Sequence, residues 1–185
     1  MTAINNTLKK ADWELDFYSR PIVDSNGKKK WEVLISSTEN FTQEQPFRWE
    51  KRCPTGEVNS KWLTEALKEA LKKAEQEGWE LPSKLRFWRP SMKTIITKAA
   101  ESVGLDPISS RRTYSLIQWL EERNRNVYPQ EEGYIGGPLA PTFSPILNQS
   151  IPLPEALRGD AWTFATLSVG ILRDASEWPM EFNSL

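Results

Sequence analysis

The sequence predicts a mixed α/β fold: an antiparallel three-strand meander followed by a helix, a strand and a helix, with the helices packed on a mixed sheet. Two observations lead to this prediction. Apolar and polar residues alternate in three stretches before residue 54, which is typical of half-buried strands. After residue 58 the apolar residues recur every three or four positions, which is typical of amphipathic helices. The 185 residues are enough to bury a core without disulfides or metal.

The meander is expected to consist of strands at 13–18, 31–35 and 47–52. Pro21 is expected to end the first strand, because proline has no amide proton to donate to a ladder. The dipeptide Asn26-Gly27 predicts a tight hairpin turn, because both central positions of a type I′ turn need a positive φ.

A helix and a short strand are expected after the meander. Asn59 or Ser60 caps the helix, and Gly78 suits its end because glycine readily adopts a positive φ there. The apolar stripe of this helix is Leu63, Ala66, Leu67, Ala70, Leu71 and Ala74. The strand follows at 85–88.

Two more helices are expected before Pro129, which a helix cannot continue through. One is capped by Ser91 and ends at Gly104. The other begins at Ser109 or Ser110 and runs to about residue 125. We expect one core that includes Trp13, Leu15, Phe17, Val33, Leu67, Leu71 and Ile96.

The chain is expected to have a main domain and an extension. Residues 1–128 form the α/β domain with a basic-aromatic surface. Residues 129–185 begin as a Pro- and Gly-rich connection and contain one more strand at 162–167. They are expected to pack on the main domain or to begin a truncated second domain. A meander followed by α-β-α is also the order at the start of ribonuclease-H-like folds, which is an analogy of topology alone.

The composition excludes several kinds of site. The chain has no histidine and a single cysteine, Cys53, so histidine-based catalytic pairs, structural zinc and an internal disulfide are excluded. We expect no catalytic residues, no metal and no cofactor. No apolar run reaches the roughly 18 residues of a membrane span, so no membrane insertion is expected. The N-terminus has no apolar signal segment, and together with the lone cysteine this predicts a cytoplasmic protein.

Positive charge is concentrated in one part of this near-neutral chain. Residues 1–128 carry 22 basic and 18 acidic side chains, whereas residues 129–185 carry two and seven. The stretch 84–125 alone has nine basic and four acidic residues. It contains the candidate RNA-binding residues, which are Arg86, Trp88, Arg89, Lys93, Arg111 and Arg112.

The first group of candidates alternates cations with aromatic rings at the end of the 85–88 strand. Arg86, Trp88 and Arg89 offer planes that stack on unpaired bases, and Lys93 adds a charge for phosphate. The simpler interpretation is structural. In that interpretation Phe87 packs inward, Arg86 and Trp88 face a helix, and Arg89 is solvated.

The second group, Arg111 and Arg112, is expected in the first turn of the last helix, where the helix dipole disfavours cations. Two arginines and free amides there could bind one phosphate. Ion pairing with Glu101 or Asp106 is an equally good explanation. The lysines at 28–30 are interpreted as a solvated loop tip that could add nonspecific attraction to phosphate.

A metal-dependent nuclease is the alternative that the fold analogy raises. Such chemistry needs several acids around cations about 4 Å apart, and Asp16 lies on the first strand, where one acid belongs. The 85–88 strand, however, ends in arginine and aromatic residues rather than an acid. We therefore favour pairing of Asp16 and Glu32 with Arg20, Lys29 or Arg48 across the sheet.

Four segments of the chain together resemble one family: WELDFYSRPIVDSNGKKKWEVLI at 13–35, KLRFWRPSMKTIITKAAESVGL at 84–105, SSRRTYSLIQWLEER at 109–123 and PLPEALRGDAWTF at 152–164. In combined order and spacing they are similar to the Tab/Atab family of RNA-binding proteins of cyanobacteria and chloroplasts. The resemblance covers most of residues 12–174. Family members are longer at the C-terminus, which leaves open that this chain is a truncation.

The resemblance implies a non-enzymatic RNA-binding protein. It would act in translation of photosystem reaction-centre messengers and in photosystem biogenesis. Its implied partners are single-stranded A/U-rich RNA in a messenger leader, and proteins of translation or photosystem assembly. The absence of a transit peptide favours a bacterial, cytoplasmic member. A third class of function also stays open, a protein-interaction scaffold in which some of the nine tryptophans contact partners.

Overall fold

The computed structural model describes residues 12–38, 45–137, 166, 168 and 169. Its strands are β1 (Trp13–Val23), β2 (Lys29–Ser37), β3 (Arg48–Cys53), β4 (Lys84–Phe87) and β5 (Asp106–Ser109). Its α-helices in the range 12–137 are α1 (Ser60–Gln76), α2 (Lys93–Ser102) and α3 (Tyr114–Asn126). Short 3-10 turns lie at η1 (Thr55–Glu57), η2 (Pro90–Met92) and η3 (Tyr128–Gln130). All of these elements belong to the first of two compact units, Met1–Pro141 and Thr142–Leu185.

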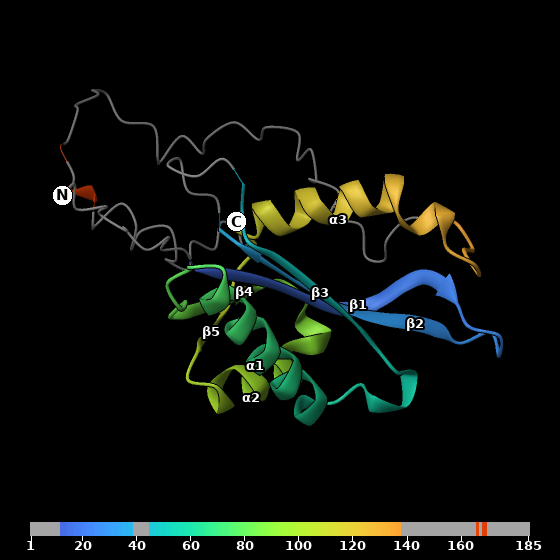
Figure 1. The fold of residues 1–185 in the computed structure, drawn as a ribbon, viewed down its shortest axis with the longest axis horizontal. Helices are drawn as coiled ribbons and strands as arrows, with labels where there is room; N and C mark the ends of the chain where they lie inside the picture. Colours follow the sequence, from blue (N-terminus) through green and yellow to red (C-terminus); the bar gives the residue numbers. More distant parts are fainter. Residues whose placement is uncertain (1–11, 39–44, 138–165, 167, 170–185) are drawn as a thin grey trace, which may run out of the picture. The chain divides into compact units, whose positions relative to one another are not determined.

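The five strands form one mixed sheet in the order β3-β2-β1-β4-β5. The first three strands pair antiparallel as the expected meander, whereas β4 is parallel to both β1 and β5. Helices α1 and α2 cover one face of the sheet, and α3 covers the other (Figure 1). The predicted mixed α/β fold with its meander is therefore confirmed. The ribonuclease-H-like assignment stays a prediction.

The β1–β2 hairpin differs from the prediction in two details. Strand β1 does not end at Pro21, because the ladder with β2 shifts register between Ser19 and Val23 and a bulge tolerates proline. The turn itself is not of type I′. Gly27 has a φ of 74°, but no residue other than glycine has a positive φ in the described ranges, so Asn26 does not. Instead the amide of Gly27 donates to the carbonyl of Asp24 at 3.0 Å.

The first helix begins and ends as predicted, but the other two begin elsewhere. Asn59 caps α1 by accepting from the amide of Trp62 at 3.0 Å. Ser91 does not cap α2, because η2 precedes that helix and its N-cap residue is Met92. The last helix begins at Tyr114 rather than at Ser109 or Ser110, because residues 106–109 form the edge strand β5.

Two hydrophobic cores flank the sheet. The core between the sheet and α1–α2 buries Trp13, Leu15, Phe17, Val33, Leu67 and Ile96, with Leu71 partly buried against it. This confirms the predicted core. The smaller core beneath α3 consists of Ile22, Leu34, Leu116, Trp119, Leu120 and Tyr128. Trp119 and Tyr128 were not among the predicted core residues.

The segment after α3 continues along the first unit as far as the structure describes it. The amide of Val23 donates to the carbonyl of Gly133 at 2.8 Å, and the amide of Ile135 donates to the carbonyl of Pro21 at 3.0 Å. The division of the chain at residues 128 and 129 stays a prediction. The strand expected at 162–167 lies, except for Thr166, outside the described residues. Among the described residues, no helix is long and apolar enough to cross a membrane.

Candidate functional site

The sheet face beneath α3 carries a row of buried acids. Glu14 and Asp16 alternate along β1, and Glu32 lies on the neighbouring strand β2. All three are at most 3% exposed. A buried carboxylate is costly unless it is paired and hydrogen-bonded, so the partners of these acids decide what this face does.

Asp16 lies between two arginines. Arg20 Nη1 donates to Asp16 Oδ2 at 2.6 Å, and Arg89 Nε donates to Asp16 Oδ1. Burial by itself would raise the pKa of Asp16, but the guanidinium groups of Arg20 and Arg89 outweigh it and hold that pKa below its usual value. Asp16 is therefore a charged structural anchor at neutral pH.

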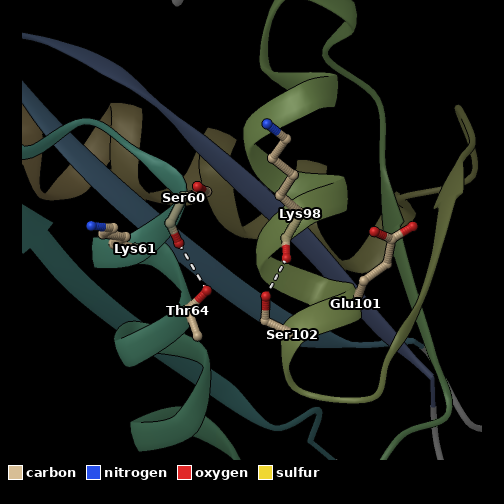
Figure 2. Close-up of a pocket in the computed structure, with 6 residues that line it drawn as sticks. All are labelled: Ser60, Lys61, Thr64, Lys98, Glu101 and Ser102. Atoms are coloured by element: carbon tan, nitrogen blue, oxygen red, sulfur yellow. Dashed lines mark hydrogen bonds between the residues drawn. The ribbon is translucent and has the colours of Figure 1, made fainter.

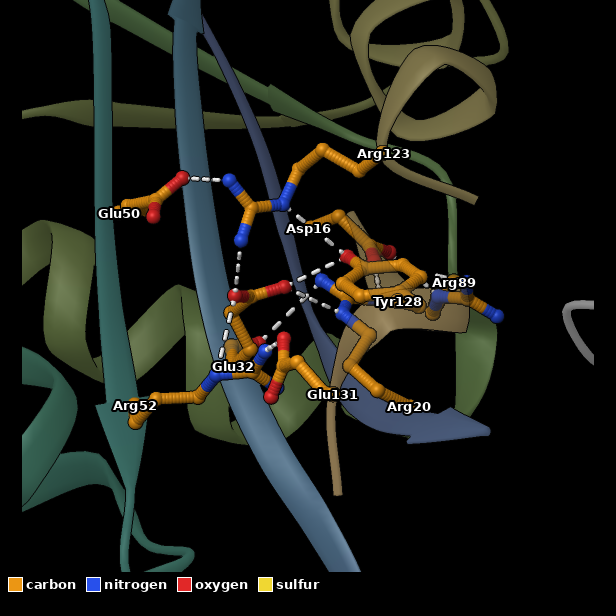
Figure 3. A network of polar contacts seen from close by, with 9 residues as sticks. All are labelled: Asp16, Arg20, Glu32, Glu50, Arg52, Arg89, Arg123, Tyr128 and Glu131. Carbon is orange, nitrogen blue, oxygen red and sulfur yellow. Dashed lines mark hydrogen bonds and ion pairs between the residues drawn. The ribbon is translucent and has the colours of Figure 1, made fainter. Parts of the chain in front are cut away.

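Glu32 is the centre of the larger part of the network (Figure 3). It accepts from Arg20 Nε at 2.9 Å, from Arg123 Nη2 at 2.8 Å and from the hydroxyl of Tyr128 at 2.6 Å. Arg52 Nε lies 3.3 Å from Glu32 Oε1, the oxygen that also accepts from Arg123. Burial raises the pKa of Tyr128, and the neighbouring Glu32 adds to that increase, so the phenol stays protonated and donates. This network joins β1, β2 and β3 to α3 and η3.

Asp16 and Glu32 are thus neutralised by arginines rather than placed around an ion. No group of three or more potential metal ligands occurs among the described residues. Arg20 is confirmed as a partner of both Asp16 and Glu32. The expected pairs with Lys29 and Arg48 do not form in the described part of the chain, where Arg48 instead pairs with Glu122 at 2.9 Å.

The structure separates the predicted RNA-binding residues into two groups. The first group is largely buried in the fold. Arg86 pairs with Asp12 at 3.0 Å, and its side chain is 12% exposed. Arg89 is not solvated as the simpler interpretation had it, since its guanidinium carbon lies 4.0 Å from the ring centres of both Tyr18 and Trp88. Trp88 in turn packs against the core beneath α3.

The second group lies on the surface. Lys93 and Arg111 are exposed, and Arg112 is half-buried. The two arginines are not in the first turn of α3 but directly precede its N-cap, Thr113. The first described residue of that helix, Tyr114, is 66% exposed. Sequence analysis missed Tyr114, although an aromatic residue two positions after an arginine pair was a usable signal.

The N-terminus of α3 is already occupied by an acid. Glu14 Oε2 accepts from the amide of Leu116 at 2.8 Å. The carboxylate therefore supplies, from the neighbouring strand, the anion that the helix dipole favours. A phosphate held by Arg111 and Arg112 would consequently bind beside this helix end rather than on that amide.

The topology brings Lys93 and Arg111 to the end of the sheet at which strands β4 and β5 terminate. Lys93 follows β4 and Arg111 follows β5, and these two strands are parallel neighbours. The chain leaves β4 toward the face that carries α2 and leaves β5 toward the face that carries α3 (Figure 1). Adjacent strands whose connections diverge in this way form a switch point, which is where open α/β sheets generally bind ligands.

Two further hollows are lined by described residues. One, between α1 and α2, has a volume of about 520 Å³, and the hydroxyl groups of its Thr64 and Ser102 are engaged within the helices (Figure 2). Thr64 donates to the carbonyl of Ser60 at 2.9 Å, and Ser102 donates to that of Lys98 at 2.6 Å. The other hollow lies at the tip of the β1–β2 hairpin and contains three cations and a tryptophan.

Known proteins similar to this chain define its family. Residues 12–123 match the model of the "RNA-binding protein Tab2/Atab2 N terminal" family, and residues 141–185 match that of the "RNA-binding protein Tab2/Atab2, C-terminal domain" family. The "Protein TAB2 homolog, chloroplastic" of Zea mays is 38% identical over 168 residues, which are 90% of this chain and 40% of that protein. The protein of the same name from Arabidopsis thaliana is also 38% identical over 168 residues, covering 88% and 41% of the two chains.

The chain thus spans about two fifths of the length of these curated relatives. A solved structure, the simian T-cell lymphotropic virus intasome in complex with PP2A regulatory subunit B56 gamma, matches with a TM-score of 0.42 and 12% identity, over 66% of this chain and 41% of that chain. At that TM-score neither a shared fold nor a shared function follows.

These findings correct one expectation and confirm another. The prediction of a cytoplasmic protein is contradicted by the two plant relatives, both of which are named chloroplastic. The resemblance found in the sequence is confirmed by the two matches, which together extend over most of the chain. The chain belongs to the Tab2/Atab2 family of RNA-binding proteins.

Proposed function

We propose that the chain binds single-stranded RNA, without cleaving it, at the sheet edge where β4 and β5 end. The residues that contact RNA are Arg111, Arg112, Lys93 and Tyr114, which we call the switch-point surface. The observation that carries the proposal is an exposed tyrosine two positions after a pair of arginines, in a member of an RNA-binding family. Guanidinium groups bind phosphate, and an exposed ring stacks on an unpaired base.

The largely buried residues Arg86, Trp88 and Arg89 position the chain segment that leads to this surface. Arg89, held between Tyr18 and Trp88 and paired with Asp16, fixes the chain as it leaves β4. Arg86, paired with Asp12, fixes the chain earlier, within β4 itself. We therefore assign positioning roles to Arg86, Trp88 and Arg89, and direct RNA contact to the surface residues.

The absence of catalysis is part of the proposal, and the arginine-neutralised acids support it. A two-metal nuclease needs carboxylates free to bind cations, whereas Asp16 and Glu32 each accept from at least two arginines. The scaffold alternative is less well supported. None of the tryptophans in the described ranges is exposed, so they do not form a partner surface there.

The biological role in this proposal is translation of photosystem reaction-centre messengers and photosystem biogenesis. The RNA would be an A/U-rich single strand in a messenger leader, and the protein partners would belong to translation or photosystem assembly. Membership of the Tab2/Atab2 family supports this role. Because the chain spans about two fifths of its relatives, the role belongs to the proposal for the whole protein.

A binding titration tests the proposal. The chain is titrated with an A/U-rich single-stranded RNA, a duplex RNA and a single-stranded DNA at several salt concentrations. We expect the single-stranded RNA to bind most tightly. The double variant Arg111→Ala/Arg112→Ala should lower the log–log salt slope by up to about 1.4, since each phosphate contact on a single strand contributes about 0.7.

Tyr114→Ala separates stacking from charge. It should weaken binding by about 1–3 kcal/mol while leaving the salt slope nearly unchanged. Thermal melts of each variant show that the fold is intact. If the folded Arg111→Ala/Arg112→Ala protein binds RNA with the wild-type affinity and slope, the switch-point surface is not the binding site.

A further inference from the structure

A second basic site lies at the tip of the β1–β2 hairpin, outside the switch-point surface. The hollow there has a volume of about 550 Å³, and we call it the hairpin hollow. Its walls include Lys28, Lys30, Trp31, Arg52, Cys53 and Glu131. The three cations come from the turn, from β2 and from β3, so the fold gathers them from positions up to 24 residues apart.

The two lysines of the hollow have no anionic partner of their own. Neither Lys28 nor Lys30 forms an ion pair with any of the described residues. The acid of the turn, Asp24, forms its hydrogen bonds within the turn itself. Its Oδ1 accepts from the amides of Asn26 and Lys28, both at 2.9 Å. The carboxylate therefore stabilises the turn, and the ammonium groups remain available to a ligand.

Arg52 contributes a guanidinium that is only partly satisfied. Its Nη2 pairs with Glu131 and its Nε with Glu32, whereas its Nη1 is buried and has no hydrogen-bond partner in the described structure. The side chain as a whole is 35% exposed. Because Nη1 itself has almost no accessible surface, Arg52 acts on an incoming anion through its positive charge rather than through a hydrogen bond from that atom.

Trp31 also lines the hollow, but its ring packs into the fold. It is half-buried and contacts Phe17 and Tyr18, with ring centres 5.8 and 5.5 Å away. Because Trp31 directly follows Lys30 in β2, the two side chains point to opposite faces of the sheet, and Trp31 packs against the core beneath α1 and α2. The cations, rather than the indole, therefore decide what the hollow can bind.

We propose that the hairpin hollow binds a phosphate of the RNA strand through Lys28 and Lys30, with the guanidinium of Arg52 adding positive charge beside them. This inference rests on the proposed function and adds a second RNA contact to it. The two lysines then contact RNA instead of only facing water. The groove between α1 and α2 is less suited, because the hydroxyl groups of Thr64 and Ser102 are already engaged within the helices.

The experiment removes the two lysine charges and compares the variant with a matched control. Lys28→Gln/Lys30→Gln is titrated with a fluorescent A/U-rich single-stranded RNA at several salt concentrations. The control, Lys72→Gln/Lys98→Gln, removes the same charge from exposed positions on α1 and α2. We expect the hairpin variant to lower the salt slope by up to about 1.4 and the control to leave it near the wild-type value.

The outcomes separate the two proposals. If Arg111→Ala/Arg112→Ala weakens binding while the hairpin variant matches its control, the hairpin site is wrong and the switch-point surface stands. If the wild-type chain binds no RNA, both are wrong. Urea unfolding of each variant, expected to match the wild type because the changed side chains are on the surface, excludes loss of binding through misfolding.

Discussion

Replacing Asp16 with asparagine removes the one negative charge that lies between two buried arginines. The side chains of Asp16 and Arg20 are fully buried, and that of Arg89 is 3% exposed. The substitution keeps the size of the side chain and one acceptor oxygen. It removes the charged acceptor that Asp16 provides to Arg89, while Arg20 retains Glu32.

The expected cost follows from burial. Breaking a buried ion pair by removing one partner costs about 3–5 kcal/mol, because the remaining charge stays out of water without compensation. The remaining acceptor of asparagine and the two aromatic rings around Arg89 place the expected value at the lower end, about 3 kcal/mol. A domain of this kind has roughly 5–15 kcal/mol of stability, so the variant should remain folded but clearly weakened.

Urea unfolding followed by far-ultraviolet circular dichroism measures this change as a shift of the midpoint. The matched control is Glu69→Gln, which breaks the exposed pair between Lys51 and Glu69 and should cost at most about 1 kcal/mol. A change of less than about 1 kcal/mol in Asp16→Asn, equal to that of the control, would refute the view that this pair anchors the sheet.

The remaining predictions concern stability at acid pH, the core, the segment after α3 and catalysis. The pKa of Asp16 is lowered in the folded state, so ionised Asp16 stabilises the fold above its ordinary pKa of about 3.9, and this contribution is lost as the pH falls through the folded-state pKa. The difference in unfolding free energy between wild type and Asp16→Asn, measured by urea unfolding, should therefore become smaller below about pH 4. Leu67→Ala should cost about 2–5 kcal/mol in the same assay, because Leu67 is fully buried; no change would place it outside the core. Gly133→Ala should lower the melting temperature more than Gly136→Ala does, because a Cβ at Gly133 would lie 2.1 Å from the carbonyl oxygen of Val23 whereas the one at Gly136 meets nothing within 4 Å; equal melting temperatures would contradict this. Prolonged incubation of labelled RNA with the wild-type chain and Mg²⁺ or Mn²⁺ should leave the RNA intact on a gel, and cleavage that disappears in Asp16→Asn would overturn the non-catalytic proposal.

Local sequence patterns were enough to predict the meander, the first helix and the larger core. Period-two alternation in β1 and β2 and the three- and four-residue spacing in α1 are local patterns, because each follows from which side chains one element turns inward. Asn59 and Gly78 mark the ends of α1 for the same reason, since a cap is a contact with the helix's own backbone.

Strand β5 could not be predicted from its sequence. Asp106-Pro107-Ile108-Ser109 has no alternation, and it becomes a strand only because β4 lies beside it and offers backbone partners. The start of α3 is fixed in the same non-local way. Its helix end is satisfied by Glu14 from β1, so no local capping side chain marks Tyr114 as the first residue.

The candidate site likewise has features that local sequence predicts and features that depend on non-local contacts. Sequence analysis found the arginine pair and the basic stretch, because composition and spacing are properties of the chain. Which cations are exposed to water depends on the tertiary structure. Asp16 and Glu32 are buried beneath α3, and a buried carboxylate requires a buried cation. Arg20, Arg89 and Arg123 are therefore buried as the partners of these acids. Arg111 has no such acid to bury against in the described structure, and it remains on the surface with Tyr114.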